Sequence, residues 1–508
     1  MASENKRIAK NTVFLYIRSF LMMAINLYAS RIILQALGVE DYGLYGAIGS
    51  IVAMFTIING SLSSGTSRFL TFELGRGDMV KLKKTFNASL AMHTGMALSL
   101  LILMETVGLW FVNYKMNIPA GREFAANVVY QMSVLTCMFS LTQVPYSATI
   151  ISHEKMDIYA YVGLVEATFK LALIFALLYL PFSDNLIAYS IILALWGAGL
   201  QLFYRFYCYK RFVETHLSFC REKKVYTEML SYSLWDTVGA FCATGNSQGI
   251  NILINIFFGV TVNAARQVAY QVENGVNQLA SNFTTSITPQ IVKSYAQGDK
   301  KRFFQLIYEA GRYSYFLMFL IAFPIILEAD YILKLWLVKV PEYTVLFTRF
   351  VLAIALYRII VRSTINGVHA TGDVKTLNLT SGVYSACSFL PLVYILFKLG
   401  LPVWSCFVVY AFNGLVCNFF EARALYKREK FGIVKYIVYV YLHPIAVSAL
   451  AGILPILIVC TIPESFMRLV LTLVVNTICL LVCVYILGIN QATRQKVKSF
   501  IKSKVHLI

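Results

Sequence analysis

Residues 59–67 read Asn-Gly-Ser-Leu-Ser-Ser-Gly-Thr-Ser, and residues 280–288, which lie 221 positions later, read Ala-Ser-Asn-Phe-Thr-Thr-Ser-Ile-Thr. Both polar stretches lie between the same two landmarks. Gly-Val at 38–39 and Gly-Asp at 77–78 recur as Gly-Val at 259–260 and Gly-Asp at 298–299, again with an offset of 221. The chain is therefore predicted to consist of two related halves.

The composition is that of a membrane protein. Apolar residues make up 58% of the 508 residues and the mean hydropathy is +0.67, whereas soluble domains contain about 45–50% apolar residues. Only 14% of residues are charged, yet the net charge is +19. The excess Lys and Arg must therefore be concentrated in the loops, and the positive charge does not indicate a nucleic-acid partner.

Windows of about 20 apolar residues predict an all-α polytopic membrane protein with 14 transmembrane helices. The second and eighth predicted spans are the most polar. The spans cover residues 11–36, 42–67, 84–112, 123–151, 157–180, 185–209, 228–258, 260–291, 303–329, 342–368, 374–397, 403–425, 433–461 and 466–488.

The basic residues predict the orientation in the membrane. Loops that a cytoplasmic N-terminus would place inside the cell hold 29 Lys and Arg, and the opposite loops hold 6. Because cytoplasmic loops carry the excess of basic residues, both termini are predicted to be cytoplasmic. The first span is too long for the apolar core of a signal peptide and is expected to remain in the protein.

The repeat predicts three parts of the chain. Residues 1–212 form an N-terminal lobe with spans 1–6, and residues 213–430 form a linker and a C-terminal lobe with spans 7–12. Residues 431–508 add two spans and a basic cytoplasmic tail. Because six is an even number, both lobes enter the membrane from the same side, so two parallel six-helix repeats are expected.

Polar side chains on the second and eighth spans are too numerous for a surface in contact with lipid, because unpaired polar groups are costly in hydrocarbon. Either tight packing through small residues or a solvated cavity accounts for the polar side chains of the second span. The amides of the eighth span favour a cavity. The predicted polar cavity lining is Asn59, Ser63, Gln267, Gln271, Asn274 and Gln278.

Three charged residues lie deep within predicted spans, where a charge costs at least about 2.5 kcal/mol. Arg18 lies roughly 10 Å past the inner end of the first span. Arg266 is similarly deep from the outer end of the eighth span, and Glu273 follows two turns later on the same face. Arg18 could instead extend to the inner headgroups.

Other charges within the spans have alternative explanations. Glu166 and Lys170 are spaced i,i+4, so an ion pair within one helix accounts for both. Arg358 and Arg362 have the same spacing and repel unless an acid or an anion lies between them. Asp236 is either an interfacial acid or an acid that titrates during transport. The candidate substrate-binding cations are Arg18, Arg266, Arg358 and Arg362, and the candidate ion-coupling groups or charge partners are Glu273, Asp236, Glu166 and Lys170.

Arginine is suited to phosphate or pyrophosphate because its planar guanidinium donates two parallel hydrogen bonds. An anionic substrate is therefore expected. The ten cysteines lack C-x-x-C spacing and the chain lacks a phosphate-binding G-x-x-x-x-G-K-[ST] motif. Neither a metal, nor another cofactor, nor direct use of ATP is expected.

Several local motifs resemble those of a known family. The N-terminal Lys-Arg-Ile-Ala-Lys-Asn-Thr at residues 6–12 precedes a span with an interior arginine, and Leu-Gly-Val-Glu-Asp-Tyr-Gly-Leu-Tyr at residues 37–45 precedes the polar second span and the Gly-Asp turn. This pattern is similar to that of the polysaccharide biosynthesis (Wzx-type) oligosaccharide flippases of the MOP superfamily, also called MATE-like, and the similarity extends over essentially the whole chain.

The resemblance implies a protein of the bacterial inner membrane that moves an undecaprenyl-pyrophosphate-linked oligosaccharide from the cytoplasmic to the periplasmic leaflet, for the synthesis of O-antigen or capsule. It also implies a central cationic cavity, alternating access and a role for Arg18 and Arg266 in the cavity. A proton or sodium ion is a candidate coupling partner, and polysaccharide polymerase machinery is a candidate protein partner. Such a protein is not an enzyme.

Three rival functions remain. A multidrug or cation antiporter of the same superfamily would bind cationic drugs through intramembrane acids. A lipid II flippase would share the fourteen spans. A membrane glycosyltransferase or polymerase would need a large periplasmic loop or an acidic metal motif, and neither is present in the sequence.

Overall fold

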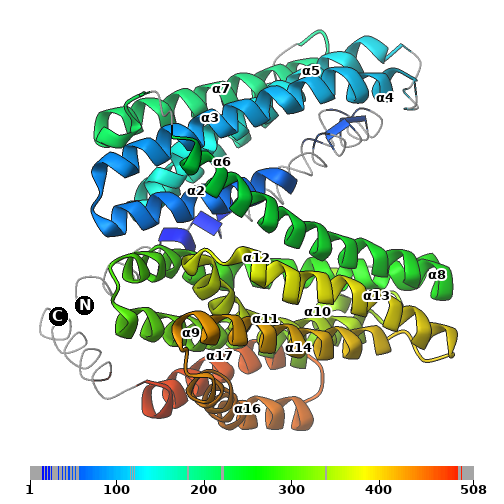
Figure 1. The fold of residues 1–508 in the computed structure, drawn as a ribbon. Helices are drawn as coiled ribbons and strands as arrows, with labels where there is room; N and C mark the ends of the chain where they lie inside the picture. The colour runs from blue at the N-terminus through cyan, green and yellow to red at the C-terminus, as the bar shows by residue number, and fades with distance from the viewer. Residues whose placement is uncertain are drawn as a thin grey trace, which may run out of the picture. The chain divides into compact units, whose positions relative to one another are not determined.

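The computed structural model describes residues 57–114, 116, 118, 121–179, 182–218, 222–337, 340–489 and 494, together with residues 14–16, 18, 19, 21, 22, 25, 33, 37, 41, 44, 45, 48, 49 and 52. This part of the chain is helical with short connections (Figure 1). The α-helices are α2 (Ile57–Arg76), α3 (Met79–Leu103), α4 (Leu109–Tyr114), α5 (Glu123–Ser152), α6 (Met156–Tyr179), α7 (Asn185–Arg211), α8 (Lys223–Ala296), α9 (Lys300–Leu327), α10 (Ala329–Trp336), α11 (Thr344–Thr371), α12 (Val374–Leu377), α13 (Val383–Lys398), α14 (Ser405–Glu429), α15 (Ile433–Tyr436), α16 (His443–Thr461) and α17 (Phe466–Cys483). A 3-10 turn, η2 (Val213–Thr215), and the π-helical turns η1 (Met104–Gly108), η3 (Asn378–Gly382), η4 (Ile437–Leu442) and η5 (Val484–Gly488) complete the described elements.

Helix α8 consists of two helices that meet at Gly259. This residue has φ 83° and ψ 177°, a backbone conformation that is essentially restricted to glycine because a Cβ would clash there. The interruption lies between the predicted seventh span (228–258) and eighth span (260–291). The Gly-Val landmark at 259–260 therefore marks a sharp reversal of the chain rather than a long loop.

Ten helices of the described residues are long and apolar enough to cross a membrane. Each begins and ends within about five residues of a predicted span. Most residues of the first predicted span lie outside the described part of the chain, while α2 and the two halves of α8 are more polar than the ten helices. The total of fourteen spans therefore remains a prediction. The ten helices cover residues 79–114, 123–152, 156–177, 185–211, 300–327, 344–371, 374–398, 405–429, 433–461 and 466–488.

The chain divides into two compact units, which we describe separately. The first unit comprises Met1–Ala240, Thr288–Lys300 and Ala370–Lys375. The second unit comprises Phe241–Ile287, Lys301–His369 and Thr376–Ile508. The lobe boundaries inferred from the sequence, 1–212, 213–430 and 431–508, stay a prediction.

In the first unit, α5 packs against α2, α3 and α7 (Figure 1). Its core includes the fully buried Tyr130, whose hydroxyl donates a 2.7 Å hydrogen bond to the carbonyl oxygen of Met104. At one end of this unit, Arg122 donates hydrogen bonds to the carboxylates of Asp41 and Asp184. Asp184 also caps α7, since its side chain accepts hydrogen bonds from the amides of residues 186 and 187.

In the second unit, the first half of α8 packs with α11, α13 and α14. Their apolar side chains form one buried cluster, which excludes water and supplies the main stabilisation of this unit. The cluster includes Ile250, Ile254, Phe347, Val351, Phe389, Val393, Phe397 and Phe407.

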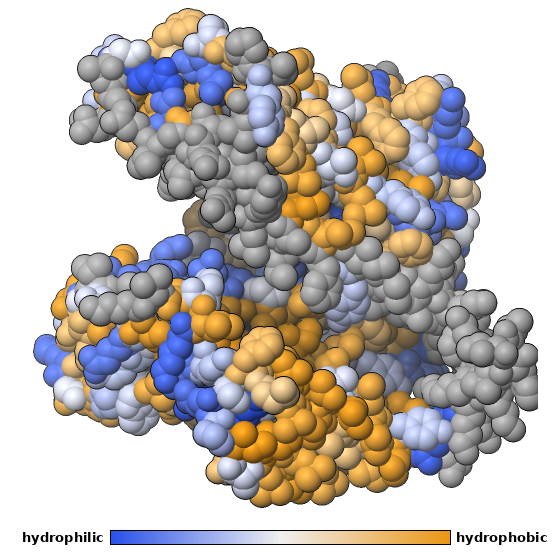
Figure 2. All heavy atoms as spheres, turned by 180° about the vertical axis from the view of Figure 1, so that it is seen from behind, coloured by the Kyte–Doolittle hydropathy of each residue, from blue (hydrophilic) through white to orange (hydrophobic). Residues whose placement is uncertain are grey.

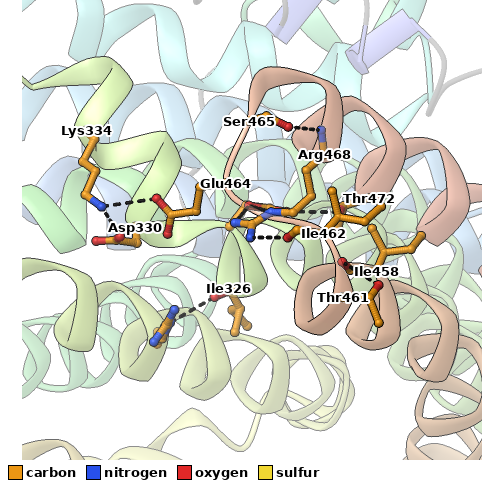
Figure 3. Close-up of polar contacts among 12 residues, drawn as sticks. Ile326, Asp330, Lys334, Ile458, Thr461, Ile462, Glu464, Ser465, Arg468 and Thr472 are labelled. Carbon is orange, nitrogen blue, oxygen red and sulfur yellow. Dashed lines mark hydrogen bonds and ion pairs between the residues drawn. The ribbon is translucent and has the colours of Figure 1, made fainter.

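A buried ion pair joins the last helix pair, α16 and α17, to the rest of the second unit, and Figure 3 shows its cation, Arg468. Glu328 precedes α10 and is 1% exposed, and Arg468 lies in the first turn of α17. The guanidinium of Arg468 donates from Nη2 to Oε2 at 2.7 Å and from Nε to Oε1 at 3.0 Å. Thr472 donates a further hydrogen bond to Oε1 at 3.1 Å. This two-pronged contact fixes both position and orientation of α17.

Large hydrophobic side chains cover much of the visible surface (Figure 2). On α16 and α17, they include Leu450, Ile453, Leu454, Val474 and Leu481, each about half exposed. Contiguous apolar surface of this extent is unfavourable in water, so it is expected to contact lipid.

Helix starts recur along the chain at a nearly constant distance. Helices α3, α5, α6 and α7 begin at residues 79, 123, 156 and 185, and helices α9, α11, α12 and α14 begin at residues 300, 344, 374 and 405. The separations are thus 221, 221, 218 and 220 residues. The glycines before α3 and α9 also share a positive φ, with 74° at Gly77 and 76° at Gly298.

Candidate functional site

A cavity of about 470 Å³ lies within the second unit. The two halves of α8 line it together with α11, α13 and α14. Its wall is mainly polar and contains two arginines and one glutamate. The lining residues are Ala243, Asn246, Ser247, Gln248, Ile250, Asn251, Arg266, Gln267, Tyr270, Glu273, Asn274, Asn277, Arg358, Ser385, Phe389, Cys406, Phe407 and Tyr410.

Arg266 is held by two neighbours on α8. Its guanidinium donates a hydrogen bond to Oδ1 of Asn251 and lies 4.3 Å from the centre of the Tyr270 ring. Gln267 also donates to Oδ1 of Asn251, at 3.1 Å. Because the residue is only 3% exposed, its position is fixed by these contacts, and the cation–π contact compensates part of the desolvation of its charge.

Glu273 and Arg358 form an ion pair in the wall of the cavity. Arg358 Nη1 lies 3.4 Å from Oε1 of Glu273, and Asn277 donates to the same oxygen at 2.9 Å. Glu273 is 3% exposed, whereas the side chain of Arg358 is 51% exposed. A single long contact leaves most donors of Arg358 directed at the cavity, so this arginine can bind a second anion.

Exposed amides form a stripe along the second half of α8. Gln267, Gln271, Asn274 and Gln278 are exposed and follow one another at spacings of four, three and four residues, which places them on one face. Gln267 and Asn274 line the cavity, and Gln271 and Gln278 continue the stripe beside it. Such a face would be costly against lipid and is expected to contact water.

Arg362 lies one turn after Arg358 on α11 and is exposed, but it does not line the described cavity. The acid that the sequence required near this arginine pair is Glu273, which contacts Arg358. The structure thus brings together five of the predicted residues, namely Arg266, Gln267, Glu273, Asn274 and Arg358.

Apart from Gln271, Gln278 and Arg362, which also lie in the second unit, the remaining predicted site residues belong to the first unit. The side chain of Arg18 lies directly against Gly163 of α6. Asp236 is half-buried and forms a hydrogen bond with Ser61 of α2. Glu166 is half-buried on α6, while the side chain of Lys170 lies outside the described part of the chain, so the predicted ion pair stays a prediction.

The polar stretch of α2 packs closely against α8 within the first unit. Asn59 and Ser63 are half-buried. A Cβ added at Gly65 would stand 2.9 Å from Oγ of Ser233, so only glycine allows the two helices this approach. This contact supports packing through small residues as one role of the stretch.

Most of the cavity-lining residues were not predicted, among them Asn251, Tyr270 and Tyr410. These three residues are uncharged, so a search for charges within apolar spans gives no signal for them. The position of Asn251 does carry a signal. Asn251 lies eight residues before Gly259, and Gln267 lies eight residues after Gly259. Two residues at equal distances from a sharp reversal are expected to contact each other.

Known proteins share this fold. A crystal structure of MATE in the straight conformation has a TM-score of 0.73 and 14% identity, over 85% of this chain and 97% of that chain. The chain has the fold of a MATE transporter. An outward-facing multidrug resistance MATE family transporter of the MOP superfamily gives a TM-score of 0.71 at 13% identity, over 85% of this chain and 97% of that one.

A third structure with the MATE fold differs in its pocket. It is a MOP superfamily transporter from Pyrococcus furiosus, whose reverse polarity of binding pocket suggests a different function. It has a TM-score of 0.69 and 12% identity, over 84% of this chain and 96% of that chain.

Sequence comparison is less informative than structural comparison for this MATE fold. No family model matches the chain. The uncharacterized membrane protein EpsK of Bacillus subtilis (strain 168) is 22% identical over 288 residues, a match that covers 55% of this chain and 55% of that protein. The chain thus spans about half the length of this curated relative.

Proposed function

We propose that the protein is a flippase that translocates an undecaprenyl-pyrophosphate-linked oligosaccharide from the cytoplasmic to the periplasmic leaflet of the bacterial inner membrane. The cationic, amide-rich cavity of the second unit carries this proposal. Among its described lining residues, the arginines outnumber the acids by two to one. An excess of positive charge attracts an anion and repels a cation.

Arg358 is the group best placed to bind phosphate. It is half exposed in the cavity, and its contact with Glu273 is long at 3.4 Å. A phosphate oxygen that approaches Arg358 can therefore replace or share this partner and form shorter, parallel hydrogen bonds. Arg266 is held in place by Asn251 and Tyr270 and adds a second, fixed positive charge to the cavity wall.

The rest of the cavity wall suits a sugar. Side-chain amides and hydroxyls, including those of Asn246, Asn274 and Ser385, can donate to and accept from sugar hydroxyls. The ring of Tyr410 offers an apolar face for the C–H surface of a sugar. One wall therefore combines cations for the pyrophosphate with amides and an aromatic ring for the glycan.

The recurring helix starts support alternating access between two parallel repeats. Equivalent helices begin 218–221 residues apart, as expected of a duplicated six-helix bundle. From this repeat and the predicted spans, we propose fourteen spans with two extra ones in residues 431–508, and from the excess of basic residues in alternate loops we propose that both termini are cytoplasmic. A polysaccharide polymerase would consume the flipped product, while the flippase itself makes and breaks no bond.

A multidrug antiporter is the second candidate, and Glu273 is the observation that favours it. This carboxylate would attract a cationic drug if Arg358 moved away from it. The similarity to a multidrug resistance MATE family transporter is consistent with this alternative. For the Pyrococcus furiosus transporter, the reverse polarity of the binding pocket suggests a different function.

The test is reconstitution in liposomes that contain a lipid-pyrophosphate-linked oligosaccharide, with the initial rate of glycan exposure as the readout. Arg358→Gln should reduce this rate about 10- to 100-fold, because a hydrogen bond to a charged group contributes about 1.5–3 kcal/mol. Arg423→Gln is the matched control, since Arg423 is exposed on α14 and does not line the cavity.

Equal rates for the wild type and Arg358→Gln would refute the role of this arginine. Movement of a cationic dye without glycan exposure would instead favour the antiporter, and in that case Glu273→Gln should abolish dye movement.

A further inference from the structure

Glu421 is a buried acid outside the cavity. It lies on α14, about one turn before the predicted end of its span at residue 425, and is 5% exposed. Asn418, on the preceding turn, forms a hydrogen bond with its carboxyl group. The second carboxyl oxygen, Oε2, is buried without a hydrogen-bond partner. A partly satisfied carboxyl group at this depth requires an explanation.

The groups that face Glu421 are uncharged in their ordinary states. They include Tyr357 from α11, Cys417 from α14, Tyr436 from α15 and Tyr441 from η4. Within the described part of the chain, no ion pair joins Glu421 to Lys, Arg or His. Its environment therefore differs from those of Glu273, which contacts Arg358, and Glu328, which contacts Arg468.

The same uncharged groups form a continuous polar cluster. Tyr441 donates to Oδ1 of Asn418 at 2.9 Å, and Asn418 donates to Oγ1 of Thr364 at 3.3 Å. Tyr357 donates to the carbonyl oxygen of Gly414 at 2.8 Å. Because these donors and acceptors bind one another, few of them remain to form hydrogen bonds with a carboxylate at residue 421. The cluster therefore offsets little of the free energy that an ionised Glu421 loses when it is removed from water.

We propose that Glu421 is a proton-binding site that couples proton exchange to movement of the cavity helices. An ionised carboxylate without a cation costs several kcal/mol in such an environment, whereas the neutral acid costs far less. In the described arrangement Glu421 carries the proton. Release breaks the carboxyl O–H bond, leaves the electron pair on the carboxylate oxygen and transfers the proton to water. The resulting charge is stable only if the cluster opens to water.

Two helices connect the proton site with the cavity. Helix α11 carries Tyr357 in the cluster and, as the next residue, Arg358 in the cavity. Helix α14 carries Glu421 and, three turns earlier, Tyr410, whose ring lies 5.6 Å from the Arg358 guanidinium. Opening of the cluster would shift α11 against α14 and so change the contact of Arg358 with Glu273. This coupling rests on the proposed transport function, but the protonation of Glu421 does not.

The protonation is tested by infrared spectroscopy on the purified full chain at neutral pH, without any substrate. The spectrum should contain the C=O stretching band of a buried, protonated carboxylic acid. Glu421→Gln should remove this band, and Asn418→Ala should shift it, because the carboxyl loses a hydrogen bond. Glu464→Gln is the control: its carboxylate is 44% exposed and should leave the band unchanged.

Absence of the band in the wild type, or its persistence in Glu421→Gln, would overturn the proposal. A band that disappears when sodium replaces potassium in the buffer would also overturn it, because Glu421 would then be a cation ligand. If Glu421→Gln fails to fold, Asn418→Ala still tests the assignment through the expected band shift.

The coupling has its own readout. In liposomes, an imposed pH gradient should change the initial rate of lipid-linked glycan exposure by the wild type and should have no effect on Glu421→Gln. A gradient response that persists in Glu421→Gln would refute the coupling. If the wild type moves no glycan, the proposed substrate fails, and the infrared result still decides whether Glu421 binds a proton.

Discussion

Replacement of Arg468 by Met should destabilise the second unit strongly. The substitution removes the two-pronged contact with Glu328, whose shortest distance is 2.7 Å, and leaves a carboxylate that is 1% exposed without its cation (Figure 3). Loss of one partner of a buried ion pair costs about 3–5 kcal/mol. The lost hydrogen bond from Nη1 to the carbonyl oxygen of Ile462, 3.0 Å long, adds about 1 kcal/mol.

The assay is reversible unfolding of the full chain in mixed micelles, with helix content followed as denaturing detergent increases. The double variant Glu328→Gln, Arg468→Met removes both charges and should recover most of the loss, which isolates the pair energy. Lys334→Met is the matched control. Its partners, Asp330 and Glu464, are exposed, so the expected loss is at most about 1 kcal/mol.

A loss for Arg468→Met no greater than that for Lys334→Met would refute the reasoning. So would a double variant as unstable as the single variant, because the cost would then come from altered packing and not from an unpaired charge.

Two further predictions concern the first unit and the amide stripe. Burial of the Glu214 carboxyl opposes ionisation, but the 2.5 Å hydrogen bond with His153, a backbone hydrogen bond of Glu214 itself and the charge interaction with His153 together outweigh it and lower the pKa of Glu214. The ionised form therefore stabilises the fold above the unfolded pKa of about 4.3 and loses this effect as the pH falls through the lower folded value. Glu214→Gln should cost about 1.5–3 kcal/mol at neutral pH, and thermal unfolding below pH 4 should show this difference from the wild type shrinking. In a cysteine-free background, Asn274→Cys should react with a membrane-impermeant thiol reagent and Ala269→Cys, which replaces a fully buried residue, should not; equal rates would contradict the wet face assigned to α8.

Much of the fold is predictable because spans in a membrane are long and apolar. The ten apolar helices follow from windows of about 20 residues. The reversal at Gly259 coincides with the predicted boundary between the seventh span (228–258) and the eighth span (260–291). By contrast, α2 and α8 are more polar and are not among these ten helices.

The site was partly predictable because charges in spans are costly and few. Arg266 and Glu273 were candidates because of their depth and Arg358 because of its spacing from Arg362, and the structure places all three around one cavity. The sequence could not show that Glu273 contacts Arg358, since 85 residues separate them. Glu421 gave no signal because it lies near the end of a span, beside basic residues. Its burial depends on tyrosines from other helices.

The Glu328–Arg468 contact has a consequence for biogenesis. Glu328 leaves the ribosome 140 residues before its cation does, so its carboxylate must wait unpaired at the edge of the membrane until the final hairpin inserts. A nascent chain that stops short of α17 would retain this unneutralised acid. Insertion of the last hairpin would then be the step that completes the fold of the second unit. A prematurely terminated chain would remain incompletely folded and would be a substrate for quality-control proteases.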